Sequence, residues 1–291
     1  MEYQSIRANP RMNLIVGVIT YNPDLNRLKE NLCAVLKQVD KVIVIDNCSK
    51  NIQDVENYLS SFPAVKLIKN AENLGVASAL NQEAKHALEN GYEWLLSLDQ
   101  DSVIPDGLVE EYQKYTDIPE IGMICCKIKD RNFGELDYNA KIIGGTEFVS
   151  ECITSASMIR LSAYEKIGGY YEPLFIDSVD FDICYSLQKA GYKILRTNEK
   201  VLLHEVGHSK KIHFFGKDRQ LVNHTPLRYY YIFRNGLFVA WRHGYLAKAI
   251  KHYTFCFLIM NLYENDRIAK DKMILKGLWH FATKKLGKYN G

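Results

Sequence analysis

The sequence predicts an α/β protein with a doubly wound, mostly parallel sheet and a helical extension at its C-terminus. Three observations support this fold class. Short apolar, β-branched runs recur along the first hundred residues, segments with helical spacing separate them, and residues 219–291 have a mainly helical pattern. Alternating strands and helices are typical of parallel βαβ units. With 291 residues, 47% of them hydrophobic, the chain is long enough to bury a sizeable core.

The regular part of the pattern spans residues 14–99. Four runs predict strands, at residues 14–19, 42–45, 65–68 and 94–98, and we expect the first two to be buried. Helical spacing between them predicts three helices, at residues 25–39, 55–62 and 76–89. Pro63 ends the second of these helices, and Gly91 provides a C-cap for the third.

After residue 118 the alternation breaks down. The pattern there predicts strands at 121–128, 142–146 and 152–160, a charged loop at 129–139, a short helix at 164–169, and a helix over 179–190 that ends at Gly191. We therefore divide the chain into a first domain, residues 1–215, and a helical extension, residues 216–291.

Composition excludes several classes of protein. Seven cysteines without a C-x-x-C pair exclude a disulfide framework and a common zinc pattern, so we expect reduced, mostly buried thiols. The first apolar run, of six residues, is too short for a secretory leader, and the run at 253–260 is too short to cross a bilayer. No G-x-G-x-x-G follows the first strand and no Walker motif is present. We expect a cytoplasmic protein, peripheral at the inner face of the cell membrane at most, with no nucleic-acid partner.

Charge is distributed unevenly along the chain. Residues 1–182 carry 17 basic and 28 acidic side chains, whereas residues 183–291 carry 20 basic and 6 acidic ones. This split is explained either by mutual attraction between the two parts or by separate binding partners, and the sequence does not favour one over the other.

Polar residues follow the predicted strands at the point where each strand ends, which is where open α/β sheets bind ligands. Asp99 and Asp101 follow the fourth strand and can share a divalent cation with a diphosphate, although such an Asp also caps a turn. Asp46 follows the second strand; it accepts a hydrogen bond from a pyrimidine N–H, or forms an Asx turn. Asn73 and Gly75 allow either a close backbone approach or a plain left-handed turn.

Three further acids, Asp177, Asp180 and Asp182, open the helix predicted at 179–190. With Asp177 as N-cap, Asp180 falls at the third helical position, and acids there stabilise the helix. The helix start is also expected to lower the pKa of a carboxylate, so that an acid of this group is ionised at neutral pH, as a general base must be.

Basic and aromatic residues gather later in the chain. His204 ends the apolar run 201–203 and suits a metal or phosphate, although a structural role is the commoner one. On a helix, Arg228 shares one face with Tyr231 and Asn235, and Arg234 shares another with Tyr230. Either this helix binds a diphosphate or it is a packed aromatic helix. Residues 266–291 form a basic amphipathic stretch that suits a membrane surface or an ordinary surface helix.

The motifs that carry a family resemblance are, in order, VGVITYNP, VIVIDNCS, NAENLGVASALNQ, WLLSLDQDS, FIDSVDFDICYSLQKAGYKI, LLHEVG and RYYYIFRN. Over residues 12–240 this set resembles the inverting family 2 glycosyltransferases of GT-A fold, and most of all their bacterial rhamnosyltransferase branch. Many family members have Glu-Asp where this chain has Val179-Asp180. The resemblance implies that Asp180 is the catalytic base, with Asp177 or Asp182 open as a second contributor.

The resemblance also implies the remaining roles. Asp99 and Asp101 would form the D-x-D pair that binds Mn²⁺ or Mg²⁺, with Asp101 nearer the metal. The implied nucleoside-binding residues are Thr20, Tyr21, Asn22, Asp46, Asn73 and Gly75. His204, Arg228 and Arg234 would lie near the diphosphate.

The implied reaction moves L-rhamnose from dTDP-rhamnose to a lipid-linked glycan in bacterial surface polysaccharide (cell wall) synthesis. A UDP-sugar donor for a hexosyl- or galactofuranosyltransferase is the alternative, and a non-catalytic nucleotide-sugar-binding subunit ranks below both. A sugar-nucleotide pyrophosphorylase would need a Gly-rich basic loop after the first strand, which is not present. The sequence leaves the oligomeric state open, including a homo-oligomer.

Overall fold

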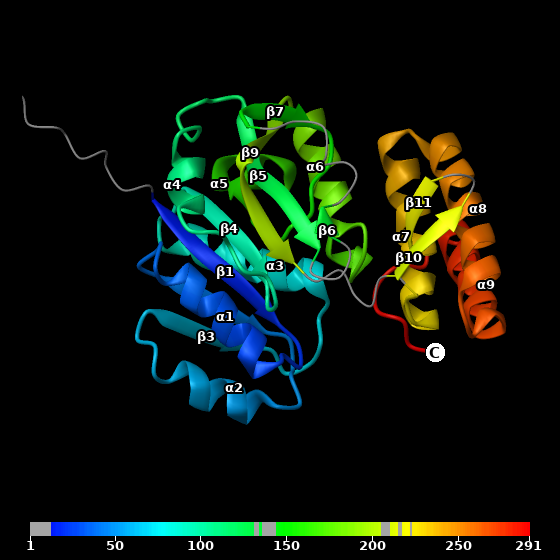
Figure 1. Ribbon diagram of the computed structural model, residues 1–291, viewed down its shortest axis with the longest axis horizontal. Helices are drawn as coiled ribbons and strands as arrows, with labels where there is room; N and C mark the ends of the chain where they lie inside the picture. The colour runs from blue at the N-terminus through cyan, green and yellow to red at the C-terminus, as the bar shows by residue number, and fades with distance from the viewer. Residues whose placement is uncertain (1–12, 131–133, 136–143, 205–209, 215–216, 222) are drawn as a thin grey trace, which may run out of the picture.

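The computed structural model describes residues 13–130, 134–135, 144–204, 210–214, 217–221 and 223–291 (Figure 1). Nine strands form one sheet in the order β3-β2-β1-β4-β8-β5-β9-β7, with β6 paired to β5. These strands are β1 (Leu14–Thr20), β2 (Val42–Asp46), β3 (Val65–Lys69), β4 (Trp94–Asp99), β5 (Ile121–Asp130), β6 (Gly134–Glu135), β7 (Thr146–Val149), β8 (Ser157–Arg160) and β9 (Lys193–His204). A hairpin of β10 (Lys210–Phe214) and β11 (Lys217–Leu221) stands apart from this sheet.

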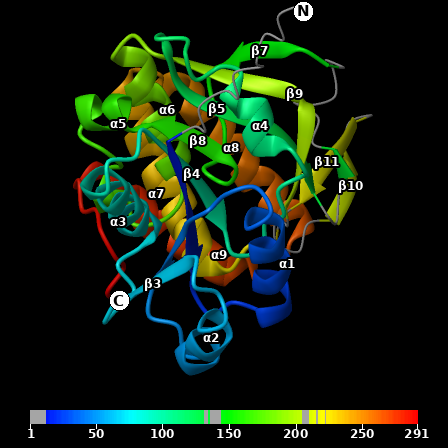
Figure 2. The same ribbon diagram turned by 90° about the vertical axis from the view of Figure 1, so that its left-hand side faces the viewer.

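Helices cover both faces of the sheet (Figures 1 and 2). The helices of the first part are α1 (Leu25–Val35), α2 (Ile52–Leu59), α3 (Val76–Glu89), α4 (Leu108–Gln113), α5 (Leu161–Ile167) and α6 (Val179–Lys189), with a short 3₁₀ turn, η2 (Glu172–Leu174). Helices α1, α2 and α4 pack on one face, and α3, α5 and α6 pack on the other. Strand β1 serves both cores, since Val16 and Val18 face one core and Ile15 and Ile19 face the other. This confirms a strand that is buried on both sides.

The first half of the sheet is parallel throughout, because β1 pairs in parallel with β2 and β4, and β2 with β3. The carboxyl ends of these four strands therefore lie at one edge. Strand β8 then runs antiparallel between β4 and β5, and β5 pairs in parallel with β9. The predicted α/β fold class is confirmed, with a mixed second half.

Three helices complete the chain: α7 (Pro226–His243), α8 (Leu246–Tyr263) and α9 (Arg267–Ala282). They lie beside the sheet domain (Figure 1). Gly277 of α9 comes so close to α7 that a β-carbon there would lie 2.7 Å from the Tyr230 carbonyl oxygen. Phe238 and Val239 of α7 join the core that α3 and α6 form with the sheet. The helical extension is thus packed into the first domain, and the division at residue 215 stays a prediction.

Most of the secondary-structure predictions that differ from the structure lie in the second half of the sequence. The strand predicted at 152–160 is confined to β8, because residues 154–156 form a bend and a turn. Helix α4 was not predicted, and residues 219–221 belong to a strand rather than to a helix. Strand β9 was missed because a polar stretch at 198–200 interrupts its apolar pattern. The register opposite β5 shifts there, from Thr197 against Cys126 to Val201 against Lys127, so this polar stretch is a bulge.

Two other predictions from the second half have mixed outcomes. Strand β5 extends to Asp130 and β6 follows, so part of the loop predicted at 129–139 is strand, and the rest lies outside the described residues. The strand predicted at 142–146 overlaps β7 only at Thr146, because residues 144–145 are bends, and residues 142–143 lie outside the described part. The seven cysteines are free thiols, but Cys33 and Cys48 are exposed rather than buried. Among the described helices, none has the length and apolar character needed to cross a membrane.

Candidate functional site

The ends of the parallel strands bring the first group of candidate residues together. Thr20, at the end of β1, lies opposite Asp46 of β2 in register, and Ile19 lies opposite Asp99 of β4. The Tyr21 amide donates a hydrogen bond of 2.8 Å to Oε1 of Gln100, which joins the loops after β1 and β4. Residues from three strands are therefore neighbours at one edge of the sheet, as the sequence predicted.

Asp46 is fully buried, and its carboxylate is bonded within the chain. Its Oδ2 accepts from the hydroxyls of Thr20 at 2.9 Å and Ser49 at 2.5 Å, and its Oδ1 accepts from the Ser49 amide at 2.8 Å. This is the Asx turn that the sequence left open as one interpretation. Contact between Asp46 and a base stays a prediction. Thr20 is buried with it.

Tyr21 and Asn22 lie further out. Tyr21 is 47% exposed, so its ring is accessible for stacking. Asn22 has a φ of 48°; its amide donates to Oγ of Ser49 at 2.7 Å, and its side-chain oxygen accepts from the Lys50 amide at 2.7 Å. Asn22 therefore connects the loops after β1 and β2, while Tyr21 offers a free aromatic surface.

Position 75 requires a glycine, both because of its backbone conformation and because a carbonyl group lies close to it. It has a φ of 89°, and a β-carbon there would lie 2.5 Å from the carbonyl oxygen of Phe175. The Val76 amide donates to the same oxygen at 2.7 Å. The side-chain oxygen of Asn73 accepts from the Gly75 amide at 2.9 Å, as in a plain turn. The close approach at Gly75 is thus to the loop before α6, and nucleotide contact by Asn73 and Gly75 stays a prediction.

Hydrogen bonds to its main-chain groups hold the Asp99–Asp101 turn in place. The side-chain amide of Asn31 donates to the carbonyl oxygens of Asp99 at 2.9 Å and Ser102 at 2.7 Å. The Asp99 amide donates to Oγ of Ser155 at 3.1 Å. Both carboxylates are partly buried. Two carboxylates are hard oxygen donors that suit Mn²⁺ or Mg²⁺. Among the described residues no group of three acids, histidines or cysteines could hold a metal, so a cation here would also need phosphate or water oxygens.

Asp180 lies at the second position of α6, because the N-cap is Ser178 rather than Asp177. Its Oδ1 accepts from the Phe181 amide at 3.0 Å. Burial, together with the nearby charges of Asp177 and Asp99, raises the pKa of Asp180 to about 7. The sequence-based expectation of a lowered pKa was therefore wrong, because desolvation outweighs the helix start. Because the charge of Asp99 contributes to this shift, the start of α6 lies within electrostatic range of the strand-end edge.

The two neighbouring acids each have a basic partner. Oδ1 of Asp177 pairs with Nη2 of Arg228 at 2.7 Å and with its Nε at 2.9 Å. Burial raises the pKa of Asp177, although the Arg228 guanidinium opposes this shift. Asp182 is buried between His243, at 2.8 Å, and Arg242, at 3.4 Å. Within the described part of the chain, Asp180 is the acid of the three that carries no basic partner.

Arg234 does not occupy the place that the sequence predicted. It is fully buried, and its Nη1 donates to the Gly287 carbonyl at 2.8 Å and to the Tyr230 hydroxyl at 3.0 Å. Its Nε donates to Oδ1 of Asn235 at 2.7 Å. These contacts hold the C-terminal tail and the loop before α6, so the guanidinium does not face the strand-end edge. We leave Arg234 out of the proposed site.

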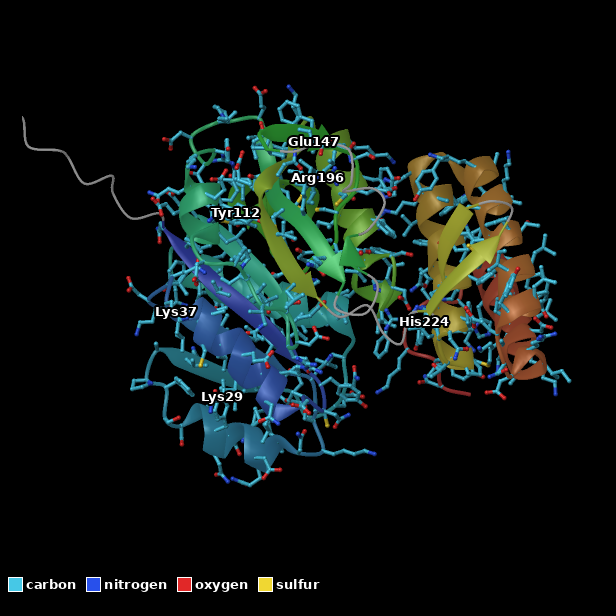
Figure 3. All side chains as sticks on the ribbon, in the orientation of Figure 1. Lys29, Lys37, Tyr112, Glu147, Arg196 and His224 are labelled. Atoms are coloured by element: carbon cyan, nitrogen blue, oxygen red, sulfur yellow. The ribbon has the colours of Figure 1, made fainter. Side chains whose placement is uncertain are left out.

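The histidines contribute little to the described site. His204 ends β9, opposite Asp130 of β5 in register, but its side chain lies outside the described residues, as does His208. His224 lies beside the start of α7 (Figure 3). Burial and the charge of Arg228 lower the pKa of His224 to about 4, so it is neutral at physiological pH. A phosphate contact by His204 stays a prediction.

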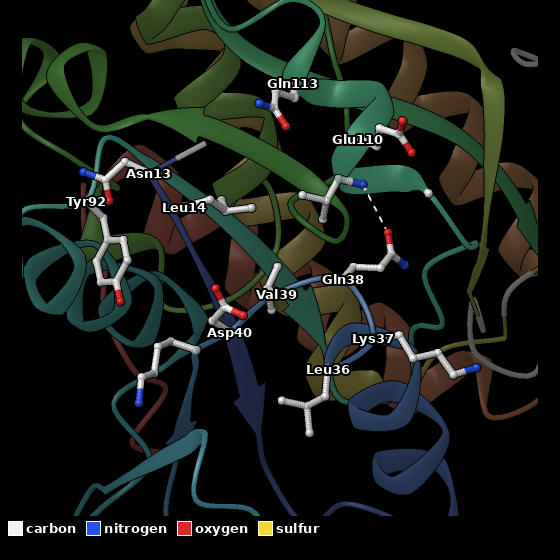
Figure 4. Close-up of a pocket in the computed structure, with 13 residues that line it drawn as sticks. Asn13, Leu14, Leu36, Lys37, Gln38, Val39, Asp40, Tyr92, Glu110 and Gln113 are labelled. Atoms are coloured by element: carbon white, nitrogen blue, oxygen red, sulfur yellow. Dashed lines mark hydrogen bonds between the residues drawn. The ribbon is translucent and has the colours of Figure 1, made fainter. Parts of the chain in front are cut away.

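A cavity of about 720 Å³ lies at the opposite edge of the sheet (Figure 4). Its lining includes Asn13, Asp40 and Tyr92, which precede β1, β2 and β4. It is therefore separate from the strand-end acids. The Arg196–Glu147 pair joins strands β9 and β7 (Figure 3).

Gln100 and Ser155 were not singled out from the sequence, and Asn235 was noted there only for the helix face that it shares with Arg228 and Tyr231. Gln100 bridges to the loop after β1, Ser155 fixes the Asp99 amide, and Asn235 holds the loop before α6. Gln100 stands between the two acids of D-x-D, so its position was a usable signal. Ser155 and Asn235 act on loops distant in sequence, and no local pattern marks such contacts.

Comparisons with known proteins agree with this geometry. Residues 15–171 match the family model described as Glycosyl transferase family 2. A curated relative, the dTDP-rhamnosyl transferase RfbF of Shigella flexneri, is 27% identical over 238 residues, covering 77% of this chain and 78% of the relative.

Solved structures show the same fold. The structure of S. aureus TarS 1–349 in complex with UDP matches 93% of this chain and 72% of its own, with a TM-score of 0.55 and 19% identity. GalNAc-T7 with UDP, GalNAc and Mn²⁺ matches 79% of this chain, with a TM-score of 0.59 and 15% identity. The chain spans about half, 47%, of the GalNAc-T7 chain.

Proposed function

Because the chain belongs to glycosyl transferase family 2, we propose that it transfers L-rhamnose from dTDP-rhamnose to a glycan acceptor with inversion at the anomeric carbon. The similarity to a dTDP-rhamnosyl transferase over most of both chains supports this donor. The position of Asp180 supports the reaction type, because the charge of Asp99 helps to raise its pKa. In the described chain Asp180 also has no basic partner, so its carboxylate is available to accept a proton.

In the proposed mechanism, Asp180 accepts the proton of an acceptor hydroxyl, whose oxygen attacks the anomeric carbon from the face opposite the diphosphate. The C–O bond to the diphosphate breaks in the same step, and dTDP leaves with the bonding electron pair. Asp99 and Asp101 would hold Mn²⁺ or Mg²⁺, which would neutralise the charge that develops on the leaving diphosphate. Arg228, which is about half-exposed, would add a second positive charge on that side.

The first experiment measures release of nucleoside diphosphate from a panel of donors, with and without Mn²⁺ or Mg²⁺. We expect metal-dependent release from dTDP-rhamnose with acceptor present. Release only from a UDP-sugar would favour a hexosyl- or galactofuranosyltransferase, and release from no donor would favour a non-catalytic binding subunit.

The second experiment assigns the base. Asp180→Asn should keep donor affinity and lower kcat by roughly 100-fold or more, as for removal of a general base. Asp106→Asn is the matched control, since Asp106 is an exposed acid on the loop between β4 and α4. Full turnover by Asp180→Asn, or an equal loss in both variants, would remove Asp180 from this role.

We further propose that the enzyme works on a lipid-linked acceptor at the inner face of the cell membrane, with α8 and α9 on the lipid. Seven large apolar side chains of this region are exposed: Ile250, Leu258, Leu262, Tyr263, Ile268, Leu275 and Trp279. Residues 246–291 carry nine Lys and Arg against three Asp and Glu. Apolar and basic residues together suit an anionic lipid surface, whereas the same basic face on a second copy would repel it.

Sedimentation with vesicles tests the lipid surface. Leu275→Ala combined with Trp279→Ala should weaken binding to vesicles that contain anionic lipid, and Ile118→Ala, an exposed apolar residue of the sheet domain, should not. Equal binding by all variants would contradict the proposal, as would a loss of self-association in place of a loss of lipid binding.

A further inference from the structure

The loop that leads into α6 has an unfavourable backbone conformation. Phe175, Asp177 and Ser178 have φ values of 67°, 65° and 61°, although none of them is glycine. Ser178 is in the left-handed helical region, which is unfavourable for a non-glycine residue. Phe175, with a ψ of −64°, is the centre of a γ-turn closed by a hydrogen bond of 2.8 Å from the Ile176 amide to the Leu174 carbonyl, and this type of turn is strained. Asp180 follows this loop by two residues, so the position of its carboxylate depends on how the loop is held.

Helix α7 holds this loop from one side. The fully buried side-chain amide of Asn235 donates to the carbonyl oxygens of Leu174 at 2.7 Å and Ile176 at 2.6 Å, with a longer contact of 3.3 Å to that of Asp177. One side chain thus satisfies carbonyl groups on both sides of Phe175.

Two further residues on the same face of α7 reach the loop. Arg228 pairs with the Asp177 carboxylate, and the ring of Tyr231 stacks on Phe175 with 5.5 Å between ring centroids. On the other side, the first amide of α3 donates to the Phe175 carbonyl, as described above. The loop is thus enclosed between α7 and the start of α3.

We propose that Asn235 is a positioning residue, which holds the loop at 174–178 so that Asp180 meets the acceptor hydroxyl. This inference rests on the proposed function, because it takes Asp180 as the base. It makes α7 part of the catalytic apparatus, so the helical extension has a role in turnover besides any contact with lipid. Asn235 itself touches neither donor nor acceptor and acts through the loop.

The test compares Asn235→Ala with Asn261→Ala. Asn261 is a matched control, because its amide also makes two hydrogen bonds in the helical extension, to the Phe257 carbonyl and to Asp271, but none to the loop. We expect Asn235→Ala to lower kcat by about 10- to 100-fold with little change in the KM for the donor, and to shift the acidic limb of the kcat–pH profile. Asn261→Ala should leave kcat and this limb unchanged.

A second variant and a measurement without turnover complete the test. Should Asn235→Ala fail to fold, Asn235→Ser, which keeps a short donor, should fold and show a smaller loss of kcat with the same shift of the limb. Hydrogen–deuterium exchange of the peptide that spans residues 174–186 measures the loop without any turnover, and it should become faster in the Asn235 variants but not in Asn261→Ala.

The outcomes separate the two proposals. Wild-type protein that transfers no sugar contradicts the proposed function, whereas the exchange experiment still reports on the loop. Unchanged kcat, pH profile and exchange in a folded Asn235 variant would overturn the positioning role. Equal losses of kcat in the Asn235 and Asn261 variants would also overturn it, since they would show a general effect on stability.

Discussion

At the scale of single residues, two buried carboxyl groups control much of the expected pH dependence. Asp180 lies at the strand-end edge with a pKa of about 7, and Glu83 of α3 is fully enclosed beneath β4. Oγ of Ser97 donates to Glu83 at 2.8 Å, and burial raises the pKa of Glu83 well above its usual value. Loss of water is the largest cause of both shifts, and the negative charges of nearby acids add to it, Asp177 and Asp99 for Asp180 and Asp99 for Glu83.

Turnover should fall as the pH drops through the pKa of Asp180, because a protonated carboxyl cannot accept the acceptor's proton. The wild-type kcat/KM, which reports the pKa values of the free enzyme, should be half-maximal at about pH 7 and should fall about tenfold per pH unit well below that value. Steady-state kinetics between about pH 5 and 9 measure this limb. A flat profile through neutrality would contradict the assignment of Asp180.

Glu83→Gln should stabilise the protein at neutral and alkaline pH. A carboxyl whose pKa is raised by folding keeps its proton in the native state and loses it on unfolding, so stability falls as the pH rises above the unfolded pKa. The decrease is about 1.4 kcal/mol per pH unit while the native group stays protonated. Thermal unfolding at several pH values should show a gap between variant and wild type that grows from acid to alkaline conditions; a constant gap would contradict this.

At the scale of elements, the contact between the start of α3 and the loop before α6 connects two motifs that lie far apart in the sequence. The sequence indicated that Gly75 permits a close approach, but not to which group. Periodicity shows which residues share a helix face, as for Arg228, Tyr231 and Asn235, and that prediction is confirmed by their common contact with the loop. It does not show what the face packs against, which is why Arg234 was misplaced.

Gly75→Ala should cost more than Gly91→Ala, although both glycines flank α3 with similar positive φ values, 89° and 73°. A β-carbon at Gly91 meets nothing within 4 Å, so only the backbone penalty of about 1–2 kcal/mol applies there. At Gly75 the clash with the Phe175 backbone adds about 1–3 kcal/mol and displaces the loop before Asp180. Denaturant unfolding together with kcat measures both effects, and equal losses would contradict the contact.

At the scale of the whole molecule, the acidic first part of the chain and the basic last part attract each other through ion pairs. Ion pairs join the acidic first part to the basic last part, among them Asp177–Arg228, Asp182–Arg242 and Glu147–Arg196. The sequence offered attraction or separate partners as alternatives, and the first is observed. The parallel half of the sheet was predictable because its strands are short, mainly apolar runs that alternate with segments of helical spacing, whereas the bulged β9 and the short β8 lack this pattern.

Heating should unfold the chain in a single calorimetric transition. Phe238 and Val239 of α7 share a core with α3 and α6, so loss of the helical extension exposes the first domain. Two well-separated transitions would show that residues 216–291 fold as an independent unit, and would support the predicted domain division at 215.

The three tryptophans differ in their surroundings, since Trp94 is 2% exposed in β4, Trp241 is 48% exposed on α7 and Trp279 is 67% exposed on α9. Indole fluorescence shifts to the blue when the ring leaves water. Emission from Trp279 would therefore report contact with vesicles, whereas emission from Trp94 would stay unchanged until the sheet unfolds. The unlabelled chain thus carries optical probes that distinguish adsorption from denaturation.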